Sequence, residues 1–528
     1  MTNNSFIDGN SADGVRKSLI EEYSSLYVFN LRGNQRTSGE LSRKEGGKIF
    51  GSGSRNGIAV LVAVKDPSHE GTAEIFYNDI GDYLTREAKL ATIRNLGSIE
   101  QIEWTRVSPN TAGDWINQRS REFDSLVPLN DGVGAIFKIR SNGIQTNRDT
   151  WVYNFSKKSL TKNVLSMIEI YNEHLERYGQ VIAATEGRQA QRDAVARGLI
   201  ETDPRKIKWT RDLISSLSRN KFIAHDACHY AIAVYRPFMK RWLYYDRDIN
   251  EYYKESIYPT SAHENLVIAV TGTGSTKPFS ALMINLLPDL EVISKSQCFP
   301  RYWYRRPDPK ESAGLFDATE SPDSSWVRED AITEEALSNY RKQYQDKSIT
   351  KDDIFYHVYG VLHSPEYHER FEQDLRRMLP RIPYPDDFWA FANAGSELGE
   401  LHCGYESIEP FPLEEVEKTR PVSYWLEKLR FAGSDKTRII YNETLELAGI
   451  PPEAHRYQVN GKSALEWLMD NNTGYGIRTD QDSGIVNNAN EWSKEVGDDR
   501  YVVDLIKKLV TVSIGTVEIT ENLPKLGL

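Results

Sequence analysis

Residues 26–67 read LYVFNLRGNQRTSGELSRKEGGKIFGSGSRNGIAVLVAVKDP, and this stretch decides the fold class of the first part of the chain. It begins with the apolar run LYVFNL and continues to a second apolar run, GIAVLVAVK, which is rich in β-branched residues. Short, nearly continuous apolar runs are typical of strands that helices cover on both faces. The stretch therefore predicts two buried strands joined by a long loop of glycine, serine and basic residues.

Helical patterns lie on both sides of these strands. Val15, Leu19 and Ile20 recur at helical spacing and predict a helix over residues 12–23, with Ser11 or Asp13 as its cap. After the second apolar run, AEIFYND predicts a third strand and the periodic DYLTREAKLATIRNL predicts a second helix. Strands that alternate with helices indicate an α/β architecture.

The pattern of apolar and aromatic residues changes near residue 151. LTKNVLSMIEIYNEHLERYGQ predicts a long amphipathic helix, and the aromatic-rich HYAIAVYRPFMKRWLYYD predicts strands. The acidic stretch ESAGLFDATESPDSSWVREDAITEE predicts an exposed loop, and it precedes a helical pair whose second helix we expect to begin at Ser364 and Pro365. We therefore expect two domains, 1–150 and 151–528, the second of mixed α+β type.

Composition indicates a globular protein that is not a general nucleic-acid coat. The 528 residues carry a net charge of −11, with 39% hydrophobic and 27% charged residues. No segment is apolar for long enough to cross a bilayer, and the N-terminus lacks the apolar core of a secretory signal, so we expect a cytoplasmic protein without membrane contact. Cys228, Cys298 and Cys403 are too widely spaced for a disulfide framework or a CxxC metal site.

The loop between the first two strands is strongly basic. Its cations are Arg32, Arg36, Arg43, Lys44, Lys48 and Arg55, against two glutamates. Glycines in the same loop allow a backbone to approach a ligand closely, and the positive charge suits a polyanion. Composition alone supports a solvated loop equally well. The loop is not a P-loop, because GxxxxGK[ST] is absent, and a nucleoside triphosphate is not indicated.

Two later segments mix cations with aromatic rings. YRPFMKRWLYYDRD contains Arg236, Lys240 and Arg241, and FPRYWYRRPDP contains Arg301 and Arg305. Such a mixture can contact backbone phosphates and stack on bases. The alternative is an ordinary strand whose aromatic side chains pack inward while its cations face water. The pattern leaves both interpretations open.

The remaining motifs predict neither a metal site nor a catalytic centre. In AHDACHY, His225 and His229 have the spacing of two ligands on one helical face, with Cys228 beside them, but no third ligand and no HExxH glutamate is identifiable. In PDLEVISK, Asp289 and Glu291 are too close together to form a nuclease centre from separate strands. No GxSxG elbow or catalytic triad is present.

Several long segments resemble one known family. TNNSFIDGNSADGVRKSL, VFNLRGNQRTSGELSRKEGGKIFGSGSR and IAVLVAVKDP resemble the rear part of the adenine-N6 methyltransferase domain of Type ISP restriction-modification enzymes. RDTWVYNF, YRPFMKRWLYYD, SQCFPRYWY, YGVLHSPEYHERF, LPRIPYPDDFWAFANAG and NGKSALEWLMDNN resemble the specificity region that follows it. The resemblance implies a partial Rossmann-like methyltransferase lobe followed by a mixed α+β target-recognition domain.

The same resemblance implies adenine methylation with S-adenosylmethionine, directed by the specificity region. The glycine-bearing cofactor motif and the NPPY motif that orients a flipped adenine are both absent from this sequence, as are the helicase and nuclease parts. We therefore expect no catalytic residue and no cofactor in this chain alone. Met1 would fall inside a domain, and residues 1 to about 80 would need a partner chain to complete the sheet.

The leading hypothesis is sequence-specific recognition of double-stranded DNA within a Type ISP-like restriction-modification system for phage defence. The alternative is an active adenine methyltransferase, completed by an N-terminal chain that carries the cofactor and NPPY motifs; a third is an inactive remnant. The expected partners are double-stranded DNA and an N-terminal methyltransferase/helicase-nuclease portion or separate chain. The expected phosphate contacts are Arg32, Arg36, Arg43, Lys44 and Arg55, and the expected groove contacts are drawn from Arg236, Lys240, Arg241, Arg301 and Arg305.

Overall fold

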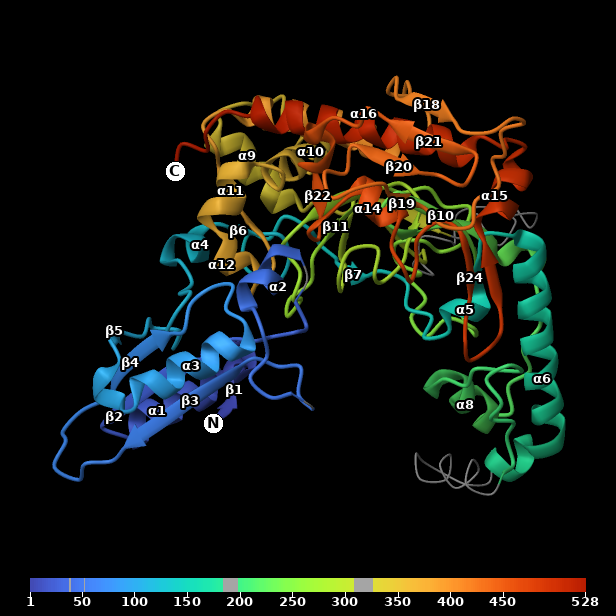
Figure 1. Cartoon of the computed structure of the whole chain (residues 1–528). Helices are drawn as coiled ribbons and strands as arrows, with labels where there is room; N and C mark the ends of the chain where they lie inside the picture. Colours follow the sequence, from blue (N-terminus) through green and yellow to red (C-terminus); the bar gives the residue numbers. More distant parts are fainter. Residues whose placement is uncertain (38, 52, 184–197, 308–325) are drawn as a thin grey trace. The chain divides into compact units, whose positions relative to one another are not determined.

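The structure is a computed structural model that describes all residues except 38, 52, 184–197 and 308–325 (Figure 1). The chain forms two compact units. Unit 1 comprises Met1–Val127, Thr273–Phe279 and Glu366–Arg381, and unit 2 comprises Pro128–Gly272, Ser280–Pro365 and Ile382–Leu528. The domain boundary expected at residue 150 therefore falls inside unit 2.

Unit 1 contains a mixed five-stranded sheet with the order β1-β3-β2-β4-β5. The strands are β1 (Thr2–Asn3), β2 (Ser25–Asn30), β3 (Ile58–Val64), β4 (Glu74–Asp79) and β5 (Thr105–Val107). Strand β2 pairs in parallel with β4 and antiparallel with β3. The three strands that the sequence predicts are thus confirmed, and they form the centre of the sheet.

Helices pack on the two faces of this sheet, which confirms the α/β architecture. The helices of unit 1 are α1 (Asp13–Glu22), α2 (Gly39–Glu45), α3 (Arg86–Leu96), α4 (Arg121–Ser125), α11 (Pro365–Arg370, whose first residue belongs to unit 2) and α12 (Glu372–Leu375). Leu26 and Val28 share one apolar cluster with Leu19 of α1, whereas Phe29 shares another with Leu90 of α3. Alternate residues of β2 thus point to opposite helical layers.

Two details of unit 1 differ from the expectation. Neither Ser11 nor Asp13 caps helix α1, because Ala12 occupies the N-cap position without a side-chain hydrogen bond. Strand β3 is also not covered on both faces along its length, since Val62 and Val64 are 42% and 43% exposed. An apolar run can therefore predict a strand correctly and still overestimate its burial.

Strand β3 has a largely open edge. On one side it pairs with β2 along its whole length, from Ala59 to Val64. On the other side its neighbour is the two-residue strand β1, which reaches only Ile58 and Ala59. Among the described residues, no strand pairs with this side of β3 beyond Ala59. Such an edge presents unpaired backbone groups that can accept another strand.

Unit 2 is a mixed assembly of small sheets and helices, consistent with the expected α+β type. Its main sheets have the orders β13-β9-β10-β8, β12-β11-β14-β7 and β18-β21-β20-β19. Their strands are β7 (Ser141–Asn142), β8 (Tyr153–Asn154), β9 (Tyr230–Arg236), β10 (Met239–Tyr244), β11 (Val267–Val270), β12 (Ala281–Ile284), β13 (Leu287–Pro288), β14 (Gln297–Pro300), β18 (Glu414–Glu417), β19 (Arg430–Phe431), β20 (Arg438–Ile440) and β21 (Leu445–Ala448). Two-stranded pairs are β15 (Tyr302–Arg305) with β16 (Val327–Asp330), β22 (Gln458–Val459) with β23 (Lys462–Ser463), and β24 (Ile477–Thr479) with β25 (Val486–Asn488).

The helices of unit 2 include the expected long amphipathic helix. Within the described part of unit 2, the α-helices are α5 (Asp149–Val152), α6 (Lys157–Ala183), α8 (Arg211–Ser218), α9 (Glu334–Gln343), α10 (Lys351–Val361), α13 (Phe388–Cys403), α14 (Ala464–Leu468), α15 (Ala489–Val496) and α16 (Tyr501–Glu521). Helix α11 begins at Pro365, directly after Ser364, as the sequence predicts. No helix among the described residues is long and apolar enough to span a membrane.

Helices α10 and α13 cross with their backbones almost in contact. A Cβ atom added to Gly395 of α13 would lie 1.9 Å from the carbonyl oxygen of Tyr356 in α10. A Cβ on Gly360 of α10 would likewise lie 2.1 Å from the carbonyl oxygen of Phe391. Each helix therefore needs a glycine at this crossing, because no larger residue fits.

The acidic stretch expected to be a loop is only partly described. Its first part, up to residue 325, lies outside the described residues. Its last part is ordered: Val327–Asp330 forms β16, and α9 begins at Glu334 with Thr333 as its cap. The loop prediction is wrong for this last part, because Tyr302–Arg305 supplies a partner strand that the local composition does not reveal.

Candidate nucleic-acid interface

A buried lysine of α3 holds the basic loop that follows β2. Lys89 of α3 is fully buried, and its ammonium group donates to the carbonyl oxygens of Leu31 at 3.0 Å and Glu45 at 2.7 Å. Burial lowers the pKa of Lys89, and the nearby carboxylate of Glu45 opposes that effect. Gly47 packs so closely that a Cβ there would lie 2.4 Å from the backbone nitrogen of Arg86. The loop therefore has a fixed base against α3.

Arg32 belongs to this base. Its guanidinium forms ion pairs with Asp79 at 2.5 Å and with Asp82, and its side chain is 22% exposed. Burial alone would lower the pKa of Arg32, but the hydrogen bond and charge of Asp79 outweigh burial and raise it. Its backbone has a positive φ of 53°. Phosphate contact by Arg32 stays a prediction, because a phosphate would have to compete with two carboxylates for the guanidinium.

The other predicted phosphate contacts lie on the surface of the loop. Arg36, Arg43, Lys44 and Arg55 are all exposed, whereas Lys48 is half-buried. Arg43 and Lys44 lie in the last turn of α2, and Arg55 donates to the carbonyl oxygen of Gln35 at 3.1 Å. This hydrogen bond joins the beginning and the end of the loop. These four exposed cations thus lie on one loop that Lys89 holds against α3. Exposed cations on a fixed loop are suited to positioning a phosphate backbone.

In unit 2, Arg236 at the end of β9 forms a buried ion pair with Asp289. The two groups are 2.6 Å apart and their side chains are 12% and 4% exposed. The guanidinium also stacks on Tyr235, 4.0 Å from the ring centre. Burial raises the pKa of Asp289 to about 7, while the carboxylate of Asp289 outweighs burial and raises the pKa of Arg236. Groove contact by Arg236 stays a prediction. The ion pair argues against it, because contact with DNA would take the guanidinium away from Asp289 and leave that buried carboxylate unpaired, which is costly.

Arg241 of β10 is also buried, with 5% exposure. Its guanidinium lies between the rings of Phe155 and Tyr235, at 4.6 and 4.1 Å, and donates to the carbonyl oxygen of Thr473 at 2.8 Å. Lys240 pairs with Glu406 at 2.7 Å. The alternative in which the cations of this strand face water is therefore wrong for Arg241, because aromatic rings enclose its charge.

Arg301 and Arg305 are partly exposed and paired. Arg301 makes a two-pronged ion pair with Asp352 at the start of α10, with 2.7 Å between Nε and Oδ1. Arg305 pairs with Glu329 of the neighbouring strand β16 at 2.7 Å. Both pairs join elements of unit 2 to one another. These ion pairs do not test the predicted groove contacts of Arg301 and Arg305, which stay predictions.

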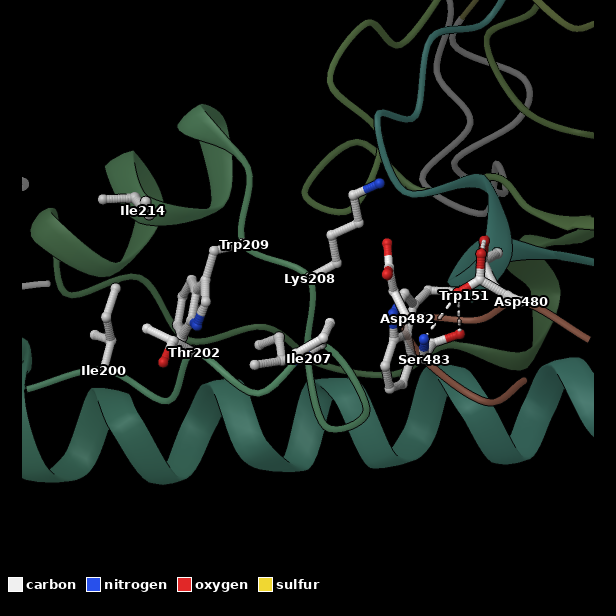
Figure 2. A pocket seen from close by; sticks show the side chains of 12 residues that line it. Trp151, Ile200, Thr202, Ile207, Lys208, Trp209, Ile214, Asp480, Asp482 and Ser483 are labelled. Carbon is white, nitrogen blue, oxygen red and sulfur yellow. Dashed lines mark hydrogen bonds between the residues drawn. The ribbon is translucent and has the colours of Figure 1, made fainter. Parts of the chain in front are cut away.

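A pocket that the sequence analysis missed lies beside the β24–β25 hairpin (Figure 2). It has a volume of about 300 Å³. Figure 2 shows Lys208 from the segment before α8, and Asp480, Asp482 and Ser483 from the hairpin turn, around this pocket, with Trp209 and Trp151 among its apolar walls. Asp480 Oδ1 accepts from the backbone N–H and the hydroxyl of Ser483, at 2.8 and 2.7 Å, which fixes the turn.

A second, larger pocket of about 510 Å³ shares the hairpin turn with the first. Its lining includes the amides Asn471, Asn472, Gln481 and Asn487, together with Asp149, Arg241 and Arg478. The Nε atoms of Arg241 and Arg478 are buried, and neither has a hydrogen-bond partner among the described residues. Buried donors normally have partners, so these two atoms are exceptions. Amide and guanidinium groups are the side chains that distinguish base edges.

The signal for these pockets in the sequence is the run MDNNTGYGIRTDQDSG, residues 469–484. Its amides, aspartates and glycines indicate turns, and by themselves they look like an ordinary exposed loop. What the composition cannot show is that the run folds back against α5 and β9–β10. Thr150 of α5 donates to Asp480 Oδ2 at 3.4 Å, and Arg241 of β10 donates to Thr473.

Comparison with known proteins places the chain in a family. The family described as the Type ISP C-terminal specificity domain matches residues 135–505, so the chain belongs to this family. A search of the curated proteins finds no match.

Three solved structures are similar over nearly the whole chain. A nuclease-deletion mutant of the Type ISP restriction-modification enzyme LlaGI, in complex with a DNA substrate mimic, is 38% identical with a TM-score of 0.84, and the match covers 99% of this chain and 46% of that one. The ATP-dependent Type ISP enzyme LlaBIII bound to DNA is 31% identical with a TM-score of 0.84, covering 99% of this chain and 33% of that one. The DrdV–DNA complex is 30% identical with a TM-score of 0.81, covering 100% and 50%. The chain thus spans half the length of these proteins or less.

Proposed function

We propose that this chain recognises a specific sequence in double-stranded DNA, as part of a Type ISP-like restriction-modification system of phage defence that is associated with adenine-N6 methylation. One observation carries the proposal: the chain matches, from end to end, proteins that were solved with DNA. In this proposal unit 2 supplies the specificity, because the family match lies mainly within it.

The physical chemistry of the two units supports different roles in DNA recognition. The exposed cations of the unit 1 loop suit phosphate contacts, which position a protein on the duplex without reading its sequence. In unit 2, the hairpin pockets offer Asn472, Gln481 and Arg478, side chains of the types that read adenine and guanine edges. We propose that the loop contributes affinity and the β24–β25 hairpin contributes sequence preference.

The phosphate role can be measured through salt dependence. For the double variant Arg36→Ala/Arg55→Ala, we expect weaker duplex binding and a slope of log K against log salt concentration that is smaller by roughly 2, because each phosphate contact releases about one counterion. Fluorescence anisotropy with a labelled duplex at several salt concentrations measures both quantities.

The matched control removes two exposed cations of unit 1 from another part of its sheet. Lys65 and Arg106 are 64% and 67% exposed, and Lys65 follows Val64, which pairs with Ser25 at the end of β2 away from the loop. Lys65→Ala/Arg106→Ala makes the same change in charge and is expected to leave the slope almost unchanged. Equal effects of the two double variants would show that only net charge matters, and would remove the proposed role of the loop.

A second candidate function, an adenine methyltransferase completed by an N-terminal portion, has its own structural support. The open side of β3 beyond Ala59 can accept a further strand, and Val62 and Val64 beside it are exposed. A partner that extends the sheet would cover both features. S-adenosylmethionine would belong to the completed enzyme, and we assign it no residue of this chain.

Reconstitution tests this second function. The chain is mixed with a separately produced polypeptide that carries the missing NPPY and cofactor motifs, and transfer of a labelled methyl group from S-adenosylmethionine to duplex DNA is measured. We expect transfer with both polypeptides and none with either alone. Backbone groups alternate along β3: Ala59 faces β1 and Val62 faces β2, so Ala63 faces the open side. Replacing Ala63 by proline therefore removes a backbone donor from that side and should reduce transfer if the partner pairs there. Absence of transfer would reject the methyltransferase while leaving DNA recognition to be judged by the binding assay.

A further inference from the structure

A cluster of metal-binding side chains lies where the β9–β10 hairpin begins and ends. Asp226, Cys228 and His229 each place one ligand atom within 4.8 Å of the other two. The spacing of His225 and His229 suggested two ligands on one helical face, and the structure rejects that pairing. Only Ala227–His229 is helical, as a single 3-10 turn, and Nε2 of His225 lies 3.0 Å from the hydroxyl of Tyr230. The third candidate ligand is Asp226, which the helical pattern did not suggest.

The backbone holds these three residues close together. Asp226 caps the 3-10 turn, because its Oδ1 accepts from the backbone N–H of Cys228 at 2.9 Å. This hydrogen bond keeps the Asp226 carboxylate close to Cys228. Ligands of a tetrahedral zinc ion lie roughly 3–4 Å apart. The side chains of Asp226 and Cys228 are exposed, and their ligand atoms lie within 4.8 Å of each other and of the His229 ligand atom, close to that spacing.

His229 lies beside a carboxylate from the turn that follows β10. Its Nδ1 lies 2.7 Å from Oδ2 of Asp246, whose side chain is 9% exposed. Oδ1 of Asp246 accepts from the backbone N–H groups of Asp248 and Ile249, at 2.7 and 3.0 Å, so the carboxylate cannot turn freely. A histidine that binds a metal through one ring nitrogen usually gives the other to a carboxylate. Asp246 stands in that supporting position.

We propose that Asp226, Cys228 and His229 bind one zinc-type divalent ion, with Nε2 of His229 as its nitrogen ligand and water in the fourth position. A thiolate and an imidazole in the same set favour zinc or a similar ion over magnesium or calcium, which prefer oxygen ligands alone. The ion would fix the 3-10 turn that precedes β9. Asp246 acts as a positioning residue and does not touch the metal.

Cobalt(II) gives a direct readout, because a thiolate ligand produces a charge-transfer absorption band in the near ultraviolet. Titration of the full chain with Co²⁺, under a phosphine reductant, is expected to give this band with one ion per chain. Cys228→Ser should abolish the band, whereas Cys403→Ser should retain it. Asp246→Asn should weaken apparent cobalt affinity by roughly 10- to 100-fold and keep the band at saturation. His225→Gln should change neither quantity.

A second measurement needs no variant. Zinc is expected to protect Cys228 of the unmodified chain from alkylation by iodoacetamide, as read by peptide mass spectrometry, while magnesium gives no protection. A cobalt band that persists in Cys228→Ser would overturn the proposal. So would a wild-type chain with neither a band nor protection of Cys228.

Discussion

Asp114→Asn is expected to lower the free energy of unfolding of unit 1 by roughly 3–5 kcal/mol, because it leaves buried arginines without their common counter-ion. Asp114 is fully buried and contacts Arg119 at 2.8 Å, Arg377 at 3.0 Å and the equally buried Arg16 at 3.6 Å. The Asp114 carboxylate thus joins three segments of the chain within unit 1. Hydrogen–deuterium exchange of the full-length chain, read on peptides of unit 1, measures the loss.

The control for Asp114 is an exposed ion pair of the same unit. Glu74→Gln breaks the pair with Arg106, in which both side chains are well exposed, and should change the unfolding free energy by no more than about 1 kcal/mol. A loss for Asp114→Asn as small as the loss for Glu74→Gln would contradict the assigned role of the buried carboxylate.

The same carboxylate makes unit 1 sensitive to acid. Burial alone would raise the pKa of Asp114, but hydrogen bonds from Arg119 and Asn110 outweigh burial and lower it from 3.8 to about 2. Because the folded pKa is below the unfolded one, the stabilisation is present above pH 4 and is lost as the pH falls towards 2. Asp114→Asn should lack this part of the acid dependence.

Gly395→Ala is expected to destabilise unit 2 by roughly 3 kcal/mol or more, at the upper end of the range for overpacked sites. The new methyl group would lie 1.9 Å from the carbonyl oxygen of Tyr356 and 2.8 Å from the backbone nitrogen of Gly360. Backbone atoms cannot rotate aside as a side chain can, so α10 and α13 would have to separate. Denaturant unfolding of the full-length chain, followed by exchange of α10 and α13 peptides, measures the effect.

Gly515→Ala is the matched helical control in unit 2. A Cβ on Gly515 of α16 would meet only the side chain of Leu401, at 3.2 Å, which can adjust. Alanine also has a higher helix propensity than glycine by about 1 kcal/mol, so we expect little change or a small gain in stability. Destabilisation of the two variants by equal amounts would show that the crossing is not limited by backbone contact.

Local patterns predicted much of the fold because they record which face of an element is apolar. Strands β2, β3 and β4 and helices α1, α3 and α6 follow from periodicity and β-branched content within single segments. The start of α11 followed from the preference of proline for the first position of a helix. These predictions needed no knowledge of distant parts of the chain.

Contacts between distant segments explain what the patterns missed. Arg236 looked available for DNA, but β13 aligns in parallel with β9 and brings Asp289 to it. Arg241 looked like a surface cation, but Phe155, which directly follows β8, packs on its guanidinium. The hairpin pockets join residues near 150, 208 and 480. Nothing in the local sequence around either arginine indicates these partners.

The open side of β3 provides a site at which copies of this polypeptide could associate. Backbone groups along a strand edge do not distinguish one incoming strand from another, so the feature that would admit a methyltransferase strand also allows two copies of the chain to pair with each other. Val62 and Val64, exposed beside that edge, would strengthen such self-association. Any strand that pairs with this edge would also prevent such self-association.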